Sequence, residues 1–201
     1  MGKEALRLDS GNYTNSAGQP FNITKFKYYI GNISLVNAKG KLYRVTNYFL
    51  VDEDNSASKK IVLPAVPKDH YTAIRFIIGV DSIHNVSGAQ SGALDPLNGM
   101  FWTWNTGYIF LKLEGRSPAS ELAGNIFEYH IGGYKKPNNC IRKIELPLTK
   151  DSRSIKIAVD IEKMLDGPAP LDFAALPSVT GPAGSVSVAD RYARMFSIEN
   201  D

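Results

Sequence analysis

The sequence predicts an all-β fold, an antiparallel β-sandwich with long irregular loops and little helix. Two observations predict it. Short runs rich in β-branched and aromatic residues recur along the chain, and Gly, Pro, Asn and Asp turns separate them. The 201 residues suit one large β domain, and 43% apolar residues are ample for its core. We therefore expect residues 1–201 to form a single domain.

The first predicted strands lie in the N-terminal third. The segment 21–37 is dense in Phe, Tyr and Ile, and 41–54 is a similar run that ends in an acidic turn cluster. The segment 59–67 is short and closed by Pro64 and Pro67, which is typical of an edge strand.

The middle and the end of the chain continue this pattern. In 71–81 apolar residues alternate, and Gly79 marks the end of the strand. The remaining predicted strands are 107–115, 125–134, 141–148 and a strand in 154–165 that runs into a short helix.

Two long irregular segments interrupt the strands. The first, 81–100, is longer than most loops of compact domains, and such loops usually carry function or lack order. The second, 165–190, is rich in Pro, Gly and Ala, and we expect it to wrap the sandwich before 191–201 forms a last helical turn or strand.

Composition excludes several classes of protein. The net charge is +3 and charges of both signs are interspersed, which gives no support for nucleic-acid or membrane-surface binding. No run of about 18 apolar residues predicts a membrane span, and the first residues lack the apolar region of a signal peptide. Cys140 stands alone, so no intrachain disulfide can form.

Both tryptophans lie in GMFWTWNTGY. On a strand, Trp102 and Trp104 would point to the same face. Such a pair forms either an aromatic packing cluster or a surface that stacks a ligand, or it places a redox-active Trp beside a metal. The local sequence favours packing, because Trp usually lies in the interior.

Few residues suit a metal site by pattern. His130 ends a predicted strand before two glycines, His84 lies in the first irregular segment, and His70 is expected in a solvated loop. Imidazole is the commonest metal ligand, yet a lone strand His is more often structural. No HxH, HxxxH or CxxC pair is present, so the sequence carries no zinc signature.

The segment 81–100 also offers oxygen ligands. Its carboxylates Asp81 and Asp95 could bind calcium, but Asp-Pro and Asn-Gly also form ordinary turns, which is the favoured interpretation. No nucleophile or acid–base pair is recognisable, so we expect a binding protein and not an enzyme.

Several blocks together resemble one family. FNITKFKYYIGNISLV, YTAIRFIIGVDSIHN, GALDPLNGMFWTWNTGYIFLKLEG and FEYHIGG, in this order, resemble the MbnP-like copper-binding domain family, in particular its members from Bacteroidetes-type bacteria. The resemblance covers nearly the whole chain. It implies a β-rich domain of the periplasm or cell surface, often lipid-anchored, whose signal sequence would lie upstream.

The resemblance also implies a mononuclear copper site. His130 matches the His of the family's His-Leu-Gly element, and Met100, Trp102 and Trp104 match its Met-x-Trp-x-Trp element. Copper(I) favours thioether and imidazole ligands, so His130 would be the primary ligand and His84 and Met100 further ones. One Trp would be oxidised to kynurenine by a dihaem partner related to cytochrome c peroxidases. The alternative is a non-metal binding or structural module of the cell envelope, in which the Trp pair belongs to the core and Asp95 pins its loop through backbone N–H groups.

Overall fold

The computed structural model describes residues 1–2, 4–104, 107–149, 154–167 and 169–199. Its fold is all-β, as the sequence predicts. The strands of its large sheet are β1 (Tyr13–Thr14), β2 (Pro20–Asn37), β3 (Leu42–Asp52), β4 (Tyr71–Ile78), β5 (Phe101–Trp102), β6 (Gly107–Arg116), β7 (Ile126–Gly132), β8 (Arg142–Pro147) and β10 (Ser178–Thr180). A separate ribbon joins β9 (Ile157–Val159) to β11 (Phe196–Ile198).

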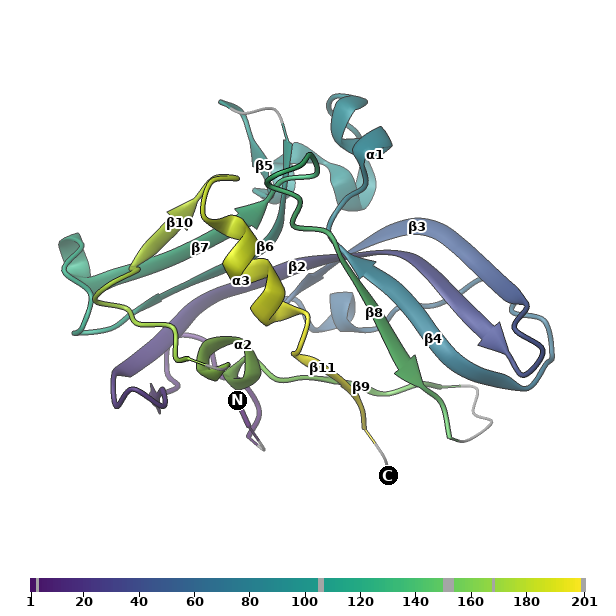
Figure 1. Cartoon of the computed structure of the whole chain (residues 1–201), viewed down its shortest axis with the longest axis horizontal. Coiled ribbons are helices and arrows are strands. Elements are labelled where there is room, and N and C mark those ends of the chain that lie inside the picture. The colour runs from purple at the N-terminus through teal and green to yellow at the C-terminus, as the bar shows by residue number, and fades with distance from the viewer. Residues whose placement is uncertain (3, 105–106, 150–153, 168, 200–201) are drawn as a thin grey trace.

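The long strand β2 belongs to both halves of the sheet. Its residues Asn22–Tyr28 pair with β6, and Ile30–Asn37 pair with β4, while β3 pairs along much of the opposite edge. The register shifts between Gly31 and Ile33, where Asn32 has a φ of 51°, and such a bulge bends a strand. Figure 1 shows the result, with β6, β7 and β10 at one end of β2 and β3, β4 and β8 at the other.

The two faces of the sheet differ in chemistry. Along β2 the side chains of Phe26, Tyr28 and Ile30 are buried in the main core, alternating with Lys25 and Lys27. The C-terminal part covers this core face: α2 (Glu162–Asp166) and α3 (Ser185–Tyr192) bury one side each, and β11 adds a buried aromatic ring (Figure 1). The opposite face carries the candidate site.

Three sequence predictions need correction. No strand forms over 59–67: a 3-10 turn, η1 (Ser56–Lys59), is followed by an irregular segment in which Ile61 and Leu63 pack against the core. Its prolines lack the N–H that a ladder needs. The segment 165–190 is not wholly irregular, because it contains β10 and the start of α3. The strand β10 also pairs with β7 in parallel, an exception to the predicted antiparallel arrangement.

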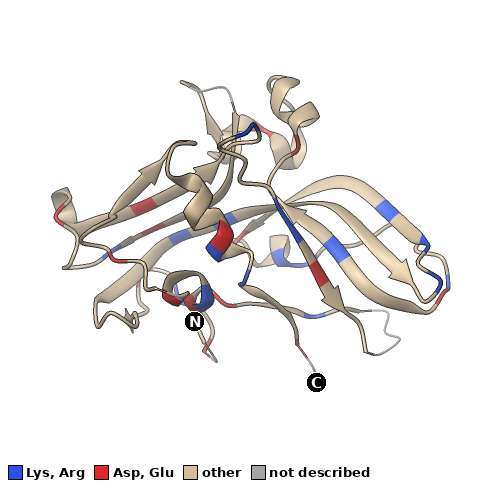
Figure 2. Cartoon of the chain, in the orientation of Figure 1, with Lys and Arg blue, Asp and Glu red and all other residues tan. Residues whose placement is uncertain are grey.

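The charged residues are distributed over the whole fold. Figure 2 shows Lys and Arg interspersed with Asp and Glu along the strands and turns, as the sequence suggests. Among the residues described, no helix is long and apolar enough to span a membrane.

Candidate metal centre

The first irregular segment begins and ends where the two halves of the sheet part. The strand β4 ends opposite Ile30 of β2, and the pairing of β6 with β2 begins at Tyr28. The chain therefore leaves the sheet and re-enters it at neighbouring positions of β2. The buried Asn85 holds these two ends together. Its Nδ2 donates to the carbonyls of Val80 (2.6 Å) and Asp81 (2.9 Å), and its Oδ1 accepts from the backbone N–H of Tyr108 (3.0 Å).

Side chains from the sheet and the loop order the remainder of the segment. The Tyr29 hydroxyl donates to the carbonyl of Ala93 (3.0 Å), and the Tyr108 hydroxyl to that of Leu94 (2.7 Å). Asp95 caps the 3-10 turn η3 (Pro96–Asn98) by accepting from the N–H of Leu97 (2.9 Å). The segment also contains α1 (Ser82–Val86) and η2 (Gly92–Leu94), so it is an ordered part of the fold.

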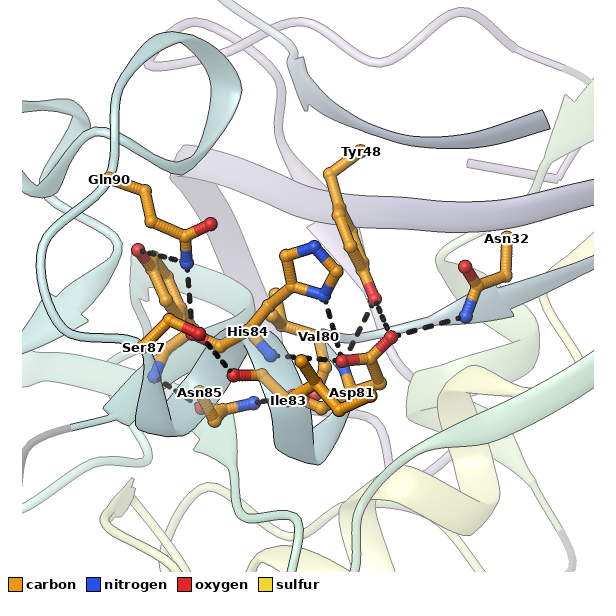
Figure 3. A network of polar contacts seen from close by, with 10 residues as sticks. Asn32, Tyr48, Val80, Asp81, Ile83, His84, Asn85, Ser87 and Gln90 are labelled. Carbon is orange, nitrogen blue, oxygen red and sulfur yellow. Dashed lines mark hydrogen bonds and ion pairs between the residues drawn. The ribbon is translucent and has the colours of Figure 1, made fainter.

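His84 lies in a network that spans three elements (Figure 3). Asp81 caps α1, accepting from the backbone N–H of His84 (3.0 Å), and its Oδ1 lies 2.8 Å from the His84 ring Nδ1. Its other oxygen accepts from the Tyr48 hydroxyl (2.7 Å). The Tyr48 ring packs on His84, with ring centroids 4.7 Å apart, and it fills the space above Gly31, where a Cβ would come within 2.3 Å of the ring.

This network keeps Asp81 ionised and orients the ring of His84. Burial acts to raise the pKa of Asp81, but hydrogen bonds from the His84 amide, the Tyr48 hydroxyl and the His84 ring outweigh it and lower the pKa to about 2. Asp81 is therefore a carboxylate that holds the Nδ1–H of His84. A neutral His84 then keeps its proton on Nδ1 and the lone pair on Nε2, and Nε2 has no hydrogen bond to any described residue. Metal-bound His is commonly oriented by a carboxylate in this way.

His130 has its own carboxylate partner. It lies on β7 opposite Lys112 of β6, and its Nε2 is 2.8 Å from Glu114 Oε1. Lys25 Nζ lies 3.3 Å from the other oxygen of Glu114. The hydrogen bond from His130, aided by the charge of Lys25, lowers the pKa of Glu114 to about 2. Glu114 is thus ionised. Because Nε2 of His130 is engaged with Glu114, Nδ1 is the ring nitrogen that can bind a ligand.

The Trp102 ring packs on the face of β7 that carries His130. A Cβ added to Gly132 would lie 2.9 Å from the six-membered ring of Trp102, so this ring occupies the space above Gly132. Because side chains alternate along a strand, Gly132 and His130 share a face, about 7 Å apart along β7. Trp102 is 5% exposed, whereas Trp104 is 67% exposed. Their rings lie 5.8 Å apart, so one tryptophan of the pair is packed and the other faces solvent.

Met100 is fully buried next to the same strands. Its carbonyl accepts from the N–H of Ile109 on β6 (2.9 Å), and the preceding carbonyl, that of Gly99, accepts from Lys112 Nζ (2.5 Å). Lys112 is the residue that pairs with His130 across β6 and β7. The lysine therefore links the strand position of His130 to the segment that carries Met100.

The structure thus brings together some of the predicted residues and not others. His130 and Trp102 share one face, and Lys112, the strand partner of His130, donates to the carbonyl of Gly99, the residue before Met100. His84 packs on β3 through Tyr48, and β6 and β2 lie between β3 and β7 in the sheet. In the part of the chain that is described, no three His, Cys, Asp or Glu side chains form a group that could hold a metal.

Three residues of these networks could not be assigned from the sequence: Glu114, Tyr48 and Asn32. Glu114 and Tyr48 meet their histidines only through strand pairing and the fold of the first irregular segment. Asn32, whose Nδ2 lies 3.5 Å from Asp81 Oδ2, depends on the bulge in β2. The glycines at 31 and 132 were the available signal, since each lacks a Cβ where an aromatic ring packs.

Comparisons with known proteins agree on one family. The family model MbnP matches residues 1–181. Among solved structures, MbnP from Methylosinus trichosporium matches with a TM-score of 0.51 and 16% sequence identity, covering 96% of this chain and 95% of that chain. At this identity the similarity to the solved structure shows the fold alone. A search of curated proteins finds no match.

Proposed function

Since the chain belongs to the MbnP family, we propose that it is an extracytoplasmic protein that binds copper for storage or delivery. The observation that carries the proposal is the common face of His130 and Trp102, beside the segment of Met100. An imidazole and a thioether are the ligand types that copper(I) prefers. The proposed role is binding and not turnover, at the periplasm or the cell surface.

His130 is the proposed primary ligand, through Nδ1. Glu114 would act as its orienting carboxylate, a role that usually raises the basicity of a ligating imidazole. Met100 is the proposed thioether ligand. His84 is also oriented by a carboxylate, but we leave it outside the ligand set of His130 because β6 and β2 stand between its position and β7.

Trp102 is the proposed site of oxidation to kynurenine, because its ring packs on Gly132, on the face of β7 that carries His130. Trp104 lies at the surface against Trp102, where a dihaem partner could reach it. Peptide mass spectrometry of the protein isolated from its native source, compared with protein produced without any partner, tests this proposal. Modification at Trp104 alone, with Trp102 intact, would contradict it.

The direct test is a titration with Cu(I) and Cu(II) under a competing chelator. The wild-type protein should bind one copper ion, and His130→Ala should lose at least tenfold in affinity, because a metal site rarely survives the loss of a primary ligand. His70→Ala, an exposed histidine ahead of β4, is the matched control and should bind as the wild type does. A wild type that does not compete with the chelator would favour the alternative, a non-metal module of the cell envelope.

A second comparison separates the two histidines. His84→Ala should leave Cu(I) affinity within about threefold of the wild type if the site is centred on His130. A loss equal to that of His130→Ala would instead place both imidazoles in one ligand sphere.

A further inference from the structure

A cavity of about 340 Å³ lies on the core face of the sheet, away from the candidate metal centre. Its walls come from β2, β3 and β4, from the irregular segment after η1, and from the ribbon β9–β11. The lining is mostly aliphatic and aromatic: Phe26, Ile30, Ile33, Val51, Ile74 and Phe76 are among its residues. The volume falls at the small end of the range of ligand pockets in proteins.

One polar group in this apolar wall has no protein partner. Tyr28 is 5% exposed and lines the cavity, and its hydroxyl makes no hydrogen bond to any described residue. All fully buried polar side-chain atoms among the described residues have partners, so the Tyr28 oxygen must keep some accessible surface. A ligand that covers this hydroxyl must supply its hydrogen-bond partner, because a hydroxyl removed from water is costly to leave unpaired.

Burial, reinforced by the negative charge of Glu53, raises the pKa of Tyr28 above its usual value. The phenol therefore stays protonated at neutral pH and can donate a hydrogen bond into the cavity.

The charges at the cavity wall disfavour an anionic ligand. Glu53 and Lys59 both line the cavity, and they neutralise each other in an ion pair with a separation of 2.5 Å. A carboxylate entering the cavity would compete with Glu53 for the lysine and would be repelled by it. A neutral ligand avoids this cost and still satisfies the phenol.

We propose that this cavity binds a neutral, largely apolar small molecule whose single hydroxyl or carbonyl oxygen accepts a hydrogen bond from Tyr28. Because a water molecule takes about 30 Å³ of liquid volume, the cavity holds on the order of ten heavy atoms. A fatty alcohol of medium chain length has this size and chemistry. The site is independent of copper, because Phe26, Tyr28 and Ile30 face the core whereas Lys27 pairs with Lys112, the strand partner of His130.

The test uses the fluorescence of a neutral apolar probe, N-phenyl-1-naphthylamine, displaced by 1-decanol or by decanoate in metal-free buffer. The full-length protein should enhance the probe's emission, and 1-decanol should displace the probe at a concentration at least tenfold lower than decanoate. Equal displacement by the two compounds, or no binding of the probe and of 1-decanol, would overturn the proposal.

Two variants of residues that line the cavity, and one control variant, test where the ligand binds. Tyr28→Phe should weaken 1-decanol about three- to tenfold, the value of one hydrogen bond, without weakening the probe. Tyr134→Phe, a tyrosine outside the cavity lining, should change neither affinity. Val51→Phe should fill the cavity and reduce binding of both compounds at least tenfold, with folding checked by circular dichroism. Unchanged 1-decanol binding in Tyr28→Phe would overturn the assignment of the phenol, whether or not Val51→Phe folds.

Discussion

At the scale of single residues, Asn85 shows how one buried side chain fixes the candidate site. It is 4% exposed and satisfies two carbonyls and one N–H at the junction of β4, α1 and β6. The strands β4 and β6 do not pair with each other, and the hydrogen bonds of the Asn85 amide connect them instead. The first irregular segment therefore starts and ends at a fixed point.

Replacing Asn85 with alanine should destabilise the protein by about 2–4 kcal/mol, because several buried backbone groups lose their partners. Urea unfolding at pH 7 measures this change. Asn12→Ala, at an exposed position, is the matched control and should stay within about 0.5 kcal/mol of the wild type. Equal stability of the two variants would show that the junction does not depend on the amide.

Cys140 predicts a pH dependence. Burial raises the pKa of its thiol to about 11, from a usual value of 9.0. The unfolded thiol ionises first as the pH rises, so the stabilisation is fully present below pH 9 and is lost between about pH 9 and 11. A shift of this size corresponds to about 3 kcal/mol at most.

The measurement is the free energy of unfolding between pH 8 and pH 10.5 for the wild type and for Cys140→Ala. The variant should be less stable at pH 8, because it leaves a cavity, but its stability should fall less steeply with pH. Parallel slopes would contradict the assignment. Burial also raises the pKa of several tyrosines, among them Tyr192, to which the charge of Cys140 contributes.

At the scale of elements, two glycines let aromatic rings lie against strands. Gly31 accommodates Tyr48, which packs on His84, and Gly132 accommodates Trp102 on the face of β7 that carries His130. The two glycines therefore determine where these aromatic rings lie on the strands.

Gly132→Ala should destabilise the protein by about 1–3 kcal/mol, as overpacking does, and should shift tryptophan emission to longer wavelength. The new Cβ would lie 2.4 Å from the carbonyl oxygen of Tyr108 and 2.9 Å from the Trp102 ring. In Gly18→Ala the Cβ meets nothing within 4 Å, and only the positive φ of 76° opposes it. This control should cost about 1 kcal/mol and leave the emission unchanged. An unshifted spectrum in Gly132→Ala would place the Trp102 ring elsewhere.

At the scale of the whole molecule, β2 joins the two halves of the sheet. It is buried along most of its 18 residues and pairs with strands of both halves. Neither half retains its central strand if the other unfolds. If residues 1–201 form a single domain, the two halves of the sheet should therefore unfold together.

We expect one unfolding transition in urea, with the same midpoint by far-ultraviolet circular dichroism and by tryptophan fluorescence. Both tryptophans lie near the β6–β7 half, whereas circular dichroism reports on all strands. Two separate midpoints would show that the halves unfold independently.

The sequence predicted the strands well where runs of β-branched and aromatic residues end in turn formers, as in β2, β4 and β7. It failed for 59–67, where apolar residues pack against the core from an irregular segment, and for α3, whose apolar residues lie in a stretch of small residues and glycine. The histidines were visible as single residues. Their carboxylate partners were not, because Glu114 meets His130 only after β6 and β7 pair.

The central claim is that copper binds at the face shared by His130 and Trp102. Anomalous scattering at the copper edge, from a crystal of the copper-loaded protein, tests it most directly. One peak is expected about 2 Å from Nδ1 of His130, a distance like that of a zinc–imidazole bond, on the side of β7 where Trp102 packs. A copper peak at Nε2 of His84 with none at His130 would contradict it.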